Sequence, residues 1–191
     1  MSKGRLEAFS DGVLAIIITI MVLELKVPHE ATLNALVELG PVFGSYVLSF
    51  VIIGTYWNNH HHTLQAAKMI DGRALWANLF LLFWLSLFPF ATAWMGENSF
   101  AAVPTAIYGV VQLMAALAYT VLLFALASVP GQPPELREAI GRDVKGKIST
   151  LGHAVGIPIS LVAPPVGLAI YISVAALWFI PDRRMERALG R

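Results

Sequence analysis

Residues 5–23 read Arg5-Leu-Glu-Ala-Phe9-Ser10-Asp11-Gly12-Val13-Leu-Ala-Ile16-Ile-Ile-Thr19-Ile20-Met-Val-Leu23. Between Val13 and Leu23 there is no charged residue, and Thr19 is the only hydroxyl. Such a run predicts a membrane-spanning helix, because about 20 apolar residues in α-helical geometry cross a bilayer. Ser10 and Asp11 then stand at the entrance of an apolar helix, where polar side chains need partners.

The composition of the whole chain is also strongly apolar. Of 191 residues, 57% are hydrophobic and 13% are charged, against about 25% charged residues in soluble domains. The mean hydropathy is +0.69, which indicates an integral membrane protein. The chain has no cysteine, which excludes disulfides, iron–sulfur clusters and thiolate zinc sites. No basic patch with interleaved aromatic residues is present, so we expect no nucleic-acid partner.

The apolar segments predict a single all-α domain over residues 1–191, a polytopic membrane protein with six transmembrane helices. The expected spans cover residues of about 5–25, 42–66, 74–94, 104–128, 146–163 and 165–181. The last two are short, and Pro164-Pro165 marks the corner between them. Charged residues 135–147 form a linker that we expect to be helical in part, and residues 33–39 a short interfacial helix.

The distribution of basic residues predicts the orientation. With the N-terminus inside, one of the 13 Lys and Arg residues, Lys26, is external. The other twelve are cytoplasmic, namely Lys3, Arg5, Lys68, Arg73, Arg137, Arg142, Lys145, Lys147, Arg183, Arg184, Arg187 and Arg191. This bias favours cytoplasmic N- and C-termini.

The first span carries one stripe of interest. Ile16, Thr19, Ile20 and Leu23 fall at i, i+3, i+4 and i+7, so they share one helix face, which Phe9 and Gly12 extend. This face is a candidate pore lining. Periodicity alone does not distinguish it from an ordinary surface that faces lipid or protein.

Asp11 lies off this stripe and about two turns inside the span, where an ionisable group costs several kcal/mol unless it is paired or hydrated. Trp57 and residues 60–62, all His, lie at a similar depth in the second span. We therefore expect Asp11 to contact Trp57 or one of these histidines. The alternative is a solvated charge at a helix end, with Ser10 bonded back to its own helix.

The sequence gives little support for catalysis or metal binding. Consecutive histidines on a helix point about 100° apart, whereas chelating pairs sit at i and i+4. No Gly-x-Ser-x-Gly or His-Glu-x-x-His motif occurs. We expect no enzyme activity, no cofactor and no structural metal. The Thr-Val-Gly-Tyr-Gly filter is also missing, so a pore in this protein would not select ions by carbonyl rings.

Several motifs together resemble a known family. They are Arg5-x-x-x-Phe9-Ser10-Asp11-Gly12, Ala15-Ile16-x-x-Thr19-x-x-x-Leu23-Glu24, Tyr46-x-x-Ser49-Phe50, Tyr56-Trp57-Asn58-Asn59-His60-His61, Leu75-Trp76-x-Asn78-Leu79 and Phe88-Pro89-Phe90. This pattern, which covers most of residues 5–94, resembles prokaryotic transmembrane protein 175 homologues, relatives of the lysosomal potassium channel of animals. The resemblance implies a homotetramer with four copies of the first helix around a central potassium-permeable pathway.

The resemblance also implies roles for single residues. Ile16 would form the principal hydrophobic constriction, with Ile20 and Leu23 as further narrow layers and Thr19 as a selective hydroxyl ring. Position 15 is Ala where animal members carry a hydroxyl, so Thr19 would act alone. Glu24 would concentrate cations at the outer mouth. The anchor of the helix would comprise Arg5, Phe9, Ser10, Asp11, Trp57 and His60 or His61.

From the resemblance and the topology we expect a leak-type potassium channel in the plasma membrane of a prokaryote. K⁺ would pass transiently and Na⁺ less readily, and membrane lipid would surround the tetramer. One alternative is a proton-coupled secondary transporter that relays protons through Asp11 and His60–His62. The other is an intramembrane metal-dependent hydrolase built on the histidines.

Overall fold

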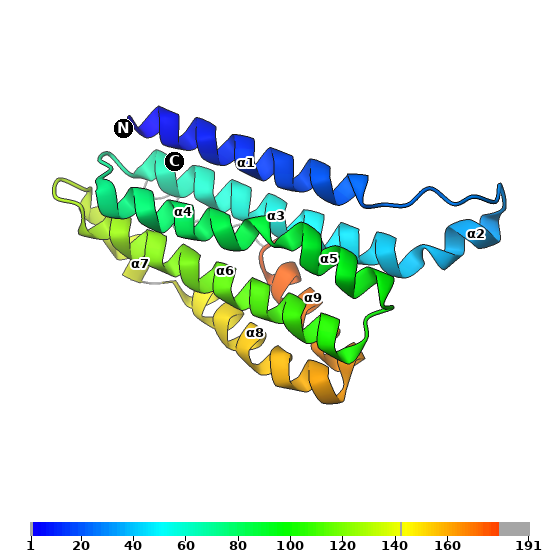
Figure 1. Ribbon diagram of the computed structural model, residues 1–191. Helices are drawn as coiled ribbons and strands as arrows, with labels where there is room; N and C mark the ends of the chain where they lie inside the picture. Colours follow the sequence, from blue (N-terminus) through cyan, green and yellow to red (C-terminus); the bar gives the residue numbers. More distant parts are fainter. Residues whose placement is uncertain (1, 142, 180–191) are drawn as a thin grey trace.

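The computed structural model describes residues 2–141 and 143–179, and within them every regular element is an α-helix. Figure 1 shows the order along the chain. The helices are α1 (Lys3–Leu23), α2 (Leu33–Glu38), α3 (Gly40–Ala66), α4 (Gly72–Ser86), α5 (Phe88–Glu97), α6 (Ala102–Ser128), α7 (Pro134–Gly141), α8 (Val144–Val162) and α9 (Pro164–Leu177).

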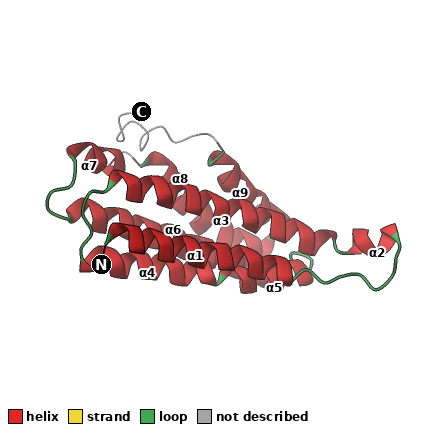
Figure 2. Cartoon of the chain, turned by 90° about the horizontal axis from the view of Figure 1, so that it is seen from above, coloured by secondary structure: helices red, strands yellow, loops and turns green. Residues whose placement is uncertain are grey.

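The long helices form a bundle with α1 at one edge and α8 at the opposite edge (Figure 1). α1 packs on α3, α4 and α5, whereas α8 and α9 pack on each other and on α6. The short helix α2 projects beyond one end of the bundle, as both ribbon views show (Figures 1 and 2). One side of α1 is therefore left without a neighbour from its own chain.

Helices lie over most of each of the six predicted segments. In the segment 74–94, α4 ends at Ser86 and α5 begins at Phe88, and the two together form one candidate span, Gly72–Glu97. Pro89 lies in the first turn of α5, where its missing N–H leaves no intrahelical bond unmade. The residue between the two helices, Leu87, caps both. α2 and α7 lie where short helices were expected.

Within residues 2–141 and 143–179, four segments are long and apolar enough to cross a membrane: α1, α3, α4 with α5, and α6. α9 is apolar but has 14 residues, about 21 Å of helix against a hydrocarbon core of about 30 Å. The chain is therefore a membrane protein with several apolar helices, and six spans remain a prediction. Residues 180–181 of the sixth predicted span, Arg142, and Arg183, Arg184, Arg187 and Arg191 lie outside the described residues.

Small residues allow α6, α8 and α9 to pack closely. Tyr171 of α9 is fully buried, and a Cβ at Gly109 of α6 or Gly156 of α8 would collide with its ring or hydroxyl. Gly167 of α9 faces Ser160 of α8 so closely that a Cβ there would lie 2.9 Å from the Ser160 Cα. Glycines at these crossings let the backbones approach, as is common between membrane helices.

Gly167→Ala is expected to destabilise the protein by about 1–3 kcal/mol, the usual cost of overpacking. The added Cβ meets the Ser160 side chain and also the Ser160 Cα, which belongs to the backbone of α8, so side-chain rotation alone does not relieve the contact. Thermal unfolding in detergent would measure the loss. Gly54→Ala in α3 is the matched control, because nothing lies within 4 Å of a Cβ there. Equal melting temperatures for the two variants would contradict the close packing of α8 and α9.

Candidate ion pathway and its anchors

α1 has two faces with opposite surroundings. Leu6, Ser10, Leu14, Ile17 and Met21 are buried against the bundle. The predicted pore stripe lies on the other side, where Ile16 is 59% exposed, Ile20 is 40% exposed and Leu23 is 80% exposed. The stripe is thus uncovered within the chain, although three of its members are large and apolar. Such a surface faces either lipid or another chain.

Thr19 lies on the same uncovered face. Its hydroxyl donates back to its own helix, with Oγ1 at 2.9 Å from the carbonyl oxygens of both Ala15 and Ile16. A hydroxyl has one proton and two lone pairs, so with the proton held by the backbone the oxygen can offer only lone pairs outward. That orientation suits a cation and disfavours an anion.

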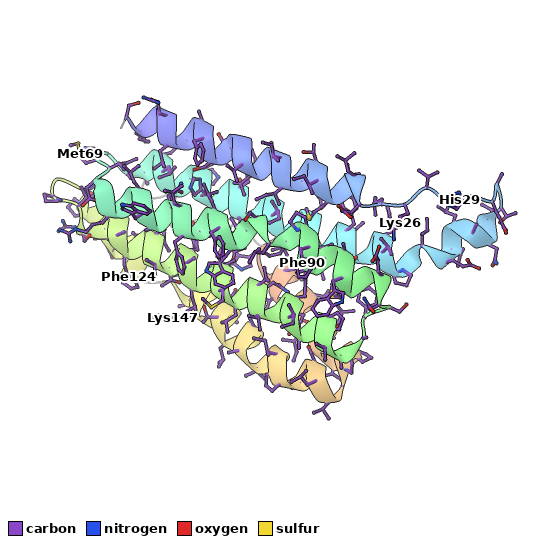
Figure 3. The ribbon with its side chains drawn as sticks, viewed as in Figure 1. Lys26, His29, Met69, Phe90, Phe124 and Lys147 are labelled. Atoms are coloured by element: carbon purple, nitrogen blue, oxygen red, sulfur yellow. The ribbon has the colours of Figure 1, made fainter. Side chains whose placement is uncertain are left out.

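The end of α1 carries negative charge. Glu24 caps the helix, and its backbone N–H donates to the carbonyl of Ile20. The carbonyl end of a helix is also the negative end of its dipole. Lys26 follows in the extended segment beyond α1 (Figure 3), with its Nζ at 2.6 Å from Oε1 of Glu97. The hydrogen bond and charge of Glu97 raise the pKa of Lys26.

Asp11 is tied to α3 through Trp57. The indole Nε1 of Trp57 donates to Oδ1 of Asp11 at 3.0 Å. The Trp57 ring stacks on His61 with 6.0 Å between centroids and 22° between planes, and Nε2 of His61 lies 2.9 Å from Nε2 of Gln65. Of the expected partners, the structure brings Trp57 to Asp11 by a hydrogen bond.

A second connection crosses the core behind Asp11. Asn78 of α4 donates from Nδ2 to Oγ of Ser10 at 2.9 Å, and its Oδ1 accepts from Nε2 of His60 at 2.7 Å. Ser10 donates in turn to the Leu6 carbonyl. Ser10 and Asn78 have no exposed surface and His60 is 2% exposed. α1, α3 and α4 are therefore joined by one buried, satisfied chain of hydrogen bonds.

Near the other end of α1 a third polar cluster forms. Ser49 of α3 bonds to the hydroxyls of Thr92 at 2.7 Å and of Tyr108 at 2.9 Å. Thr92 also reaches the sulfur of Met21 at 3.9 Å. Asn78, Thr92 and Tyr108 were not among the predicted site residues. Thr92 and Tyr108 are marked in the sequence only by polarity inside an apolar segment, and Asn78 also by its place in the motif Leu75-Trp76-x-Asn78-Leu79. Neither signal reveals a partner.

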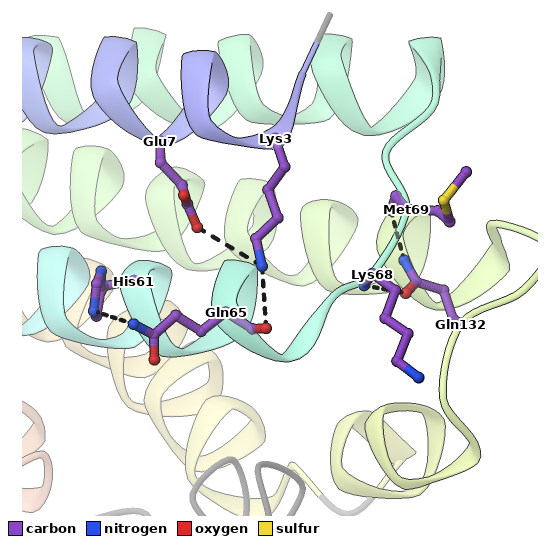
Figure 4. Close-up of polar contacts among 7 residues, drawn as sticks. All are labelled: Lys3, Glu7, His61, Gln65, Lys68, Met69 and Gln132. Carbon is purple, nitrogen blue, oxygen red and sulfur yellow. Dashed lines mark hydrogen bonds and ion pairs between the residues drawn. The ribbon is translucent and has the colours of Figure 1, made fainter.

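Lys3 connects the start of α1, the end that we expect on the cytoplasmic side, to α3 (Figure 4). Its Nζ donates to the carbonyl of Gln65 at 3.1 Å and lies 4.0 Å from Oε1 of Glu7. Lys3 was not among the predicted anchors, and two residues that were predicted behave differently. Arg5 and Phe9 lie on the exposed side of α1, so any packing role for them requires a neighbouring chain. Within the described residues no group of three or more His, Asp or Glu side chains is placed to hold a metal.

Comparisons with known proteins give a consistent result. The family model described as endosomal/lysosomal potassium channel TMEM175 matches residues 5–89. A potassium channel of Chryseobacterium sp. is 50% identical over 189 residues, 99% of this chain and 98% of that protein. A potassium channel of Streptomyces collinus is 30% identical over 188 residues, 93% of this chain and 91% of that protein.

A solved structure extends the likeness to three dimensions. The crystal structure of a lysosomal potassium-selective channel TMEM175 homolog from Chamaesiphon minutus aligns with a TM-score of 0.82 at 26% identity. The alignment covers 93% of this chain and 96% of that chain. The similarity thus includes α8 and α9, which lie beyond the family model.

Proposed function

Because this chain belongs to the TMEM175 family, we propose that it is a potassium-permeable, leak-type cation channel with an ion pathway lined by α1. The two bacterial relatives are named potassium channels, and the aligned crystal structure is of a potassium-selective one. We place it as a multi-pass protein of a prokaryotic plasma membrane, with no enzymatic activity and no cofactor.

The proposed assembly is a homotetramer of six-span subunits with cytoplasmic termini and four α1 helices around the axis. The observation that carries it is the uncovered stripe of α1, since Ile16, Ile20 and Leu23 stay exposed while the opposite side is packed. Around an axis, these side chains would face one another. The membrane lipid would then contact outer surfaces, where Phe90 and Phe124 point away from the bundle (Figure 3).

Ile16 would form the principal constriction, with Ile20 and Leu23 as further narrow layers. A ring of branched apolar side chains blocks ions by dewetting, because an ion that crosses it loses hydration without gaining ligands. Opening requires α1 to shift or rotate. Asp11, Trp57, Ser10, Asn78 and His60 would resist that movement, as struts between α1 and the helices behind it.

Thr19→Val is expected to lower discrimination between K⁺ and Na⁺. The change keeps the shape of the side chain and removes the only hydroxyl that faces the proposed pathway. If the hydroxyl ring as a whole contributes about 0.5–1.5 kcal/mol to this discrimination, the permeability ratio should fall by about 2- to 10-fold. Reversal potentials under K⁺ and Na⁺ gradients would measure it. Thr19→Ser keeps the hydroxyl and should retain selectivity; loss in both variants would contradict a hydroxyl ring.

Glu24 would increase the local K⁺ concentration at the outer mouth together with the carbonyl ends of α1.

The secondary-transporter alternative gains no support from the hydrogen bonds described for the proposed relay. Asp11 bonds to Trp57, His60 to Asn78, and His61 to Gln65. The comparisons favour a channel over this alternative.

The experiment that tests the proposed function is a conductance measurement on purified protein in liposomes under opposed K⁺ and Na⁺ gradients. We expect a non-saturating current that reverses toward the K⁺ equilibrium potential. A flux that saturates with substrate and depends on a proton gradient would contradict the channel.

A further inference from the structure

A cavity lies inside the subunit, away from α1. Its lining comes from α3, α6, α8 and α9, and its volume is about 50 Å³. The residues that line it include several with polar side chains, among them Tyr56, Gln112, Tyr119, Asp143, Ser149 and His153. Asp143 caps the start of α8, so the cavity extends from that helix end toward the middle of the bundle. The pathway proposed along α1 and this cavity share no lining residue.

Two side chains at the cavity lack hydrogen-bond partners among the described residues. They are His153, 5% exposed and unpartnered at both ring nitrogens, and Gln112, 2% exposed and unpartnered at Nε2. A buried polar group without a partner costs about 1–3 kcal/mol. A neutral imidazole needs one acceptor and one donor, and an amide nitrogen needs an acceptor. Water meets all of these needs, whereas a lipid acyl chain meets none.

The size of the cavity agrees with this chemistry. One water needs about 10–15 Å³ of such volume and two to four polar partners. The cavity of about 50 Å³ therefore has room for about three to five waters.

A second hollow adjoins this cavity and leads toward the surface. The two share Thr55, Asn59 and Trp178 in their linings, and Asn58 lines the outer hollow. Trp178 stands at the junction. Its Nε1 donates to Oγ of Ser149 at 2.9 Å, and Nζ of Lys145 lies 5.8 Å from its ring centroid. Trp178 is thus held between α8 contacts as a partition between the hollows.

We propose that the two hollows form a water-binding crevice within each subunit, in which a short chain of waters bonds to Gln112 and His153. Trp178 controls the exchange of this water with bulk solvent. The crevice hydrates a histidine that would otherwise be sealed among apolar helices. It is separate from the proposed ion pathway, and its test requires no measurement of conductance.

Radiolytic hydroxyl-radical labelling of the full-length protein in lipid nanodiscs tests the crevice with water itself as the probe. The wild-type chain contains a matched pair of histidines, because His153 and His60 are both almost fully buried. His60 is paired with Asn78, whereas His153 lines the cavity. We expect oxidation of His153 to be several-fold faster than that of His60. Rapid mixing with ¹⁸O-labelled water should carry the heavy isotope into the His153 product.

Two variants sharpen the test. Trp178→Ala should raise the labelling rate at His153 and its isotope exchange while leaving His60 unchanged, because it removes the partition. Gln112→Leu should lower labelling at His153, because it removes one of the groups that holds the water. Labelling of His153 no faster than that of His60, in both the wild type and Trp178→Ala, would overturn the proposal and indicate a dry or lipid-filled cavity.

Discussion

Ile16→Asn is expected to raise K⁺ flux through the reconstituted protein by about tenfold or more. In the proposed tetramer four asparagine side chains would replace the narrowest apolar ring, and their amides would keep water in the constriction. A reduction of the crossing barrier by only about 1.4 kcal/mol gives a tenfold rate increase. The exposure of Ile16 within the chain means that the change disturbs no packing in the subunit. Flux is measured with a K⁺-sensitive dye in liposomes.

Two controls separate a wetted pore from general damage. Ile16→Leu keeps the ring apolar and should retain the low flux of the wild type. Val22→Asn places the same amide on an exposed part of α1 that lies off the stripe and should have little effect. If Ile16→Asn leaves the flux of correctly assembled protein unchanged, α1 does not form the gate.

Asn78→Ala is expected to cost about 2 kcal/mol of stability, which corresponds to a loss of about 4–8 °C in melting temperature for a chain of this size. The substitution removes both hydrogen bonds of a side chain with no exposed surface, leaving Nε2 of His60 without its acceptor and Ser10 without its donor. Interhelical hydrogen bonds in membranes contribute less to stability than the desolvation of their polar groups suggests. We therefore expect a loss no larger than this. Thermal unfolding in detergent, followed by size-exclusion chromatography, gives the shift.

The matched control is Asn98→Ala, at an exposed asparagine that donates only to its own helix; we expect little change there. The pair Asn78→Leu and His60→Phe adds a coupling test, because replacing both partners leaves neither of these two positions with an unpaired buried polar group. The double variant should lose less stability than the sum of the single ones. Additive losses would show that Asn78 and His60 do not act together.

Features that depend on local periodicity could be read from the sequence. The apolar runs located the helices, because length and hydropathy reflect the membrane solvent. The i, i+3, i+4, i+7 spacing placed Ile16, Thr19, Ile20 and Leu23 on one face, and the structure leaves that face uncovered. The family resemblance drawn from residues 5–94 is confirmed by the match over residues 5–89 and by the relatives. Roles in conduction stay predictions.

Features that depend on how helices dock could not be read in this way. Asp11 lies at a similar depth in the membrane to Trp57 and the three histidines, so the sequence allowed any of them as its partner. The rotation of α3 about its own axis turns Trp57 toward Asp11 in the structure. Asn78 was one polar residue in an apolar segment until α4 brought it between Ser10 and His60. Gln112 and His153, which have unpartnered side-chain nitrogens, line one cavity only because α6 and α8 pack together there.

The sequence by itself thus determined that this is a helical membrane protein, where its helices lie, and that α1 has a stripe distinct from the face carrying Ser10. The tertiary structure decided which groups hold α1 in place, where the third segment breaks at Leu87, and that a cavity lies away from α1. The physical reason is the separation along the chain of the residues that interact. Helix formation and hydrophobic periodicity are fixed by neighbours within a few residues, whereas hydrogen-bond partners 18 to 68 residues apart, such as those of Asn78, are fixed by interhelical packing.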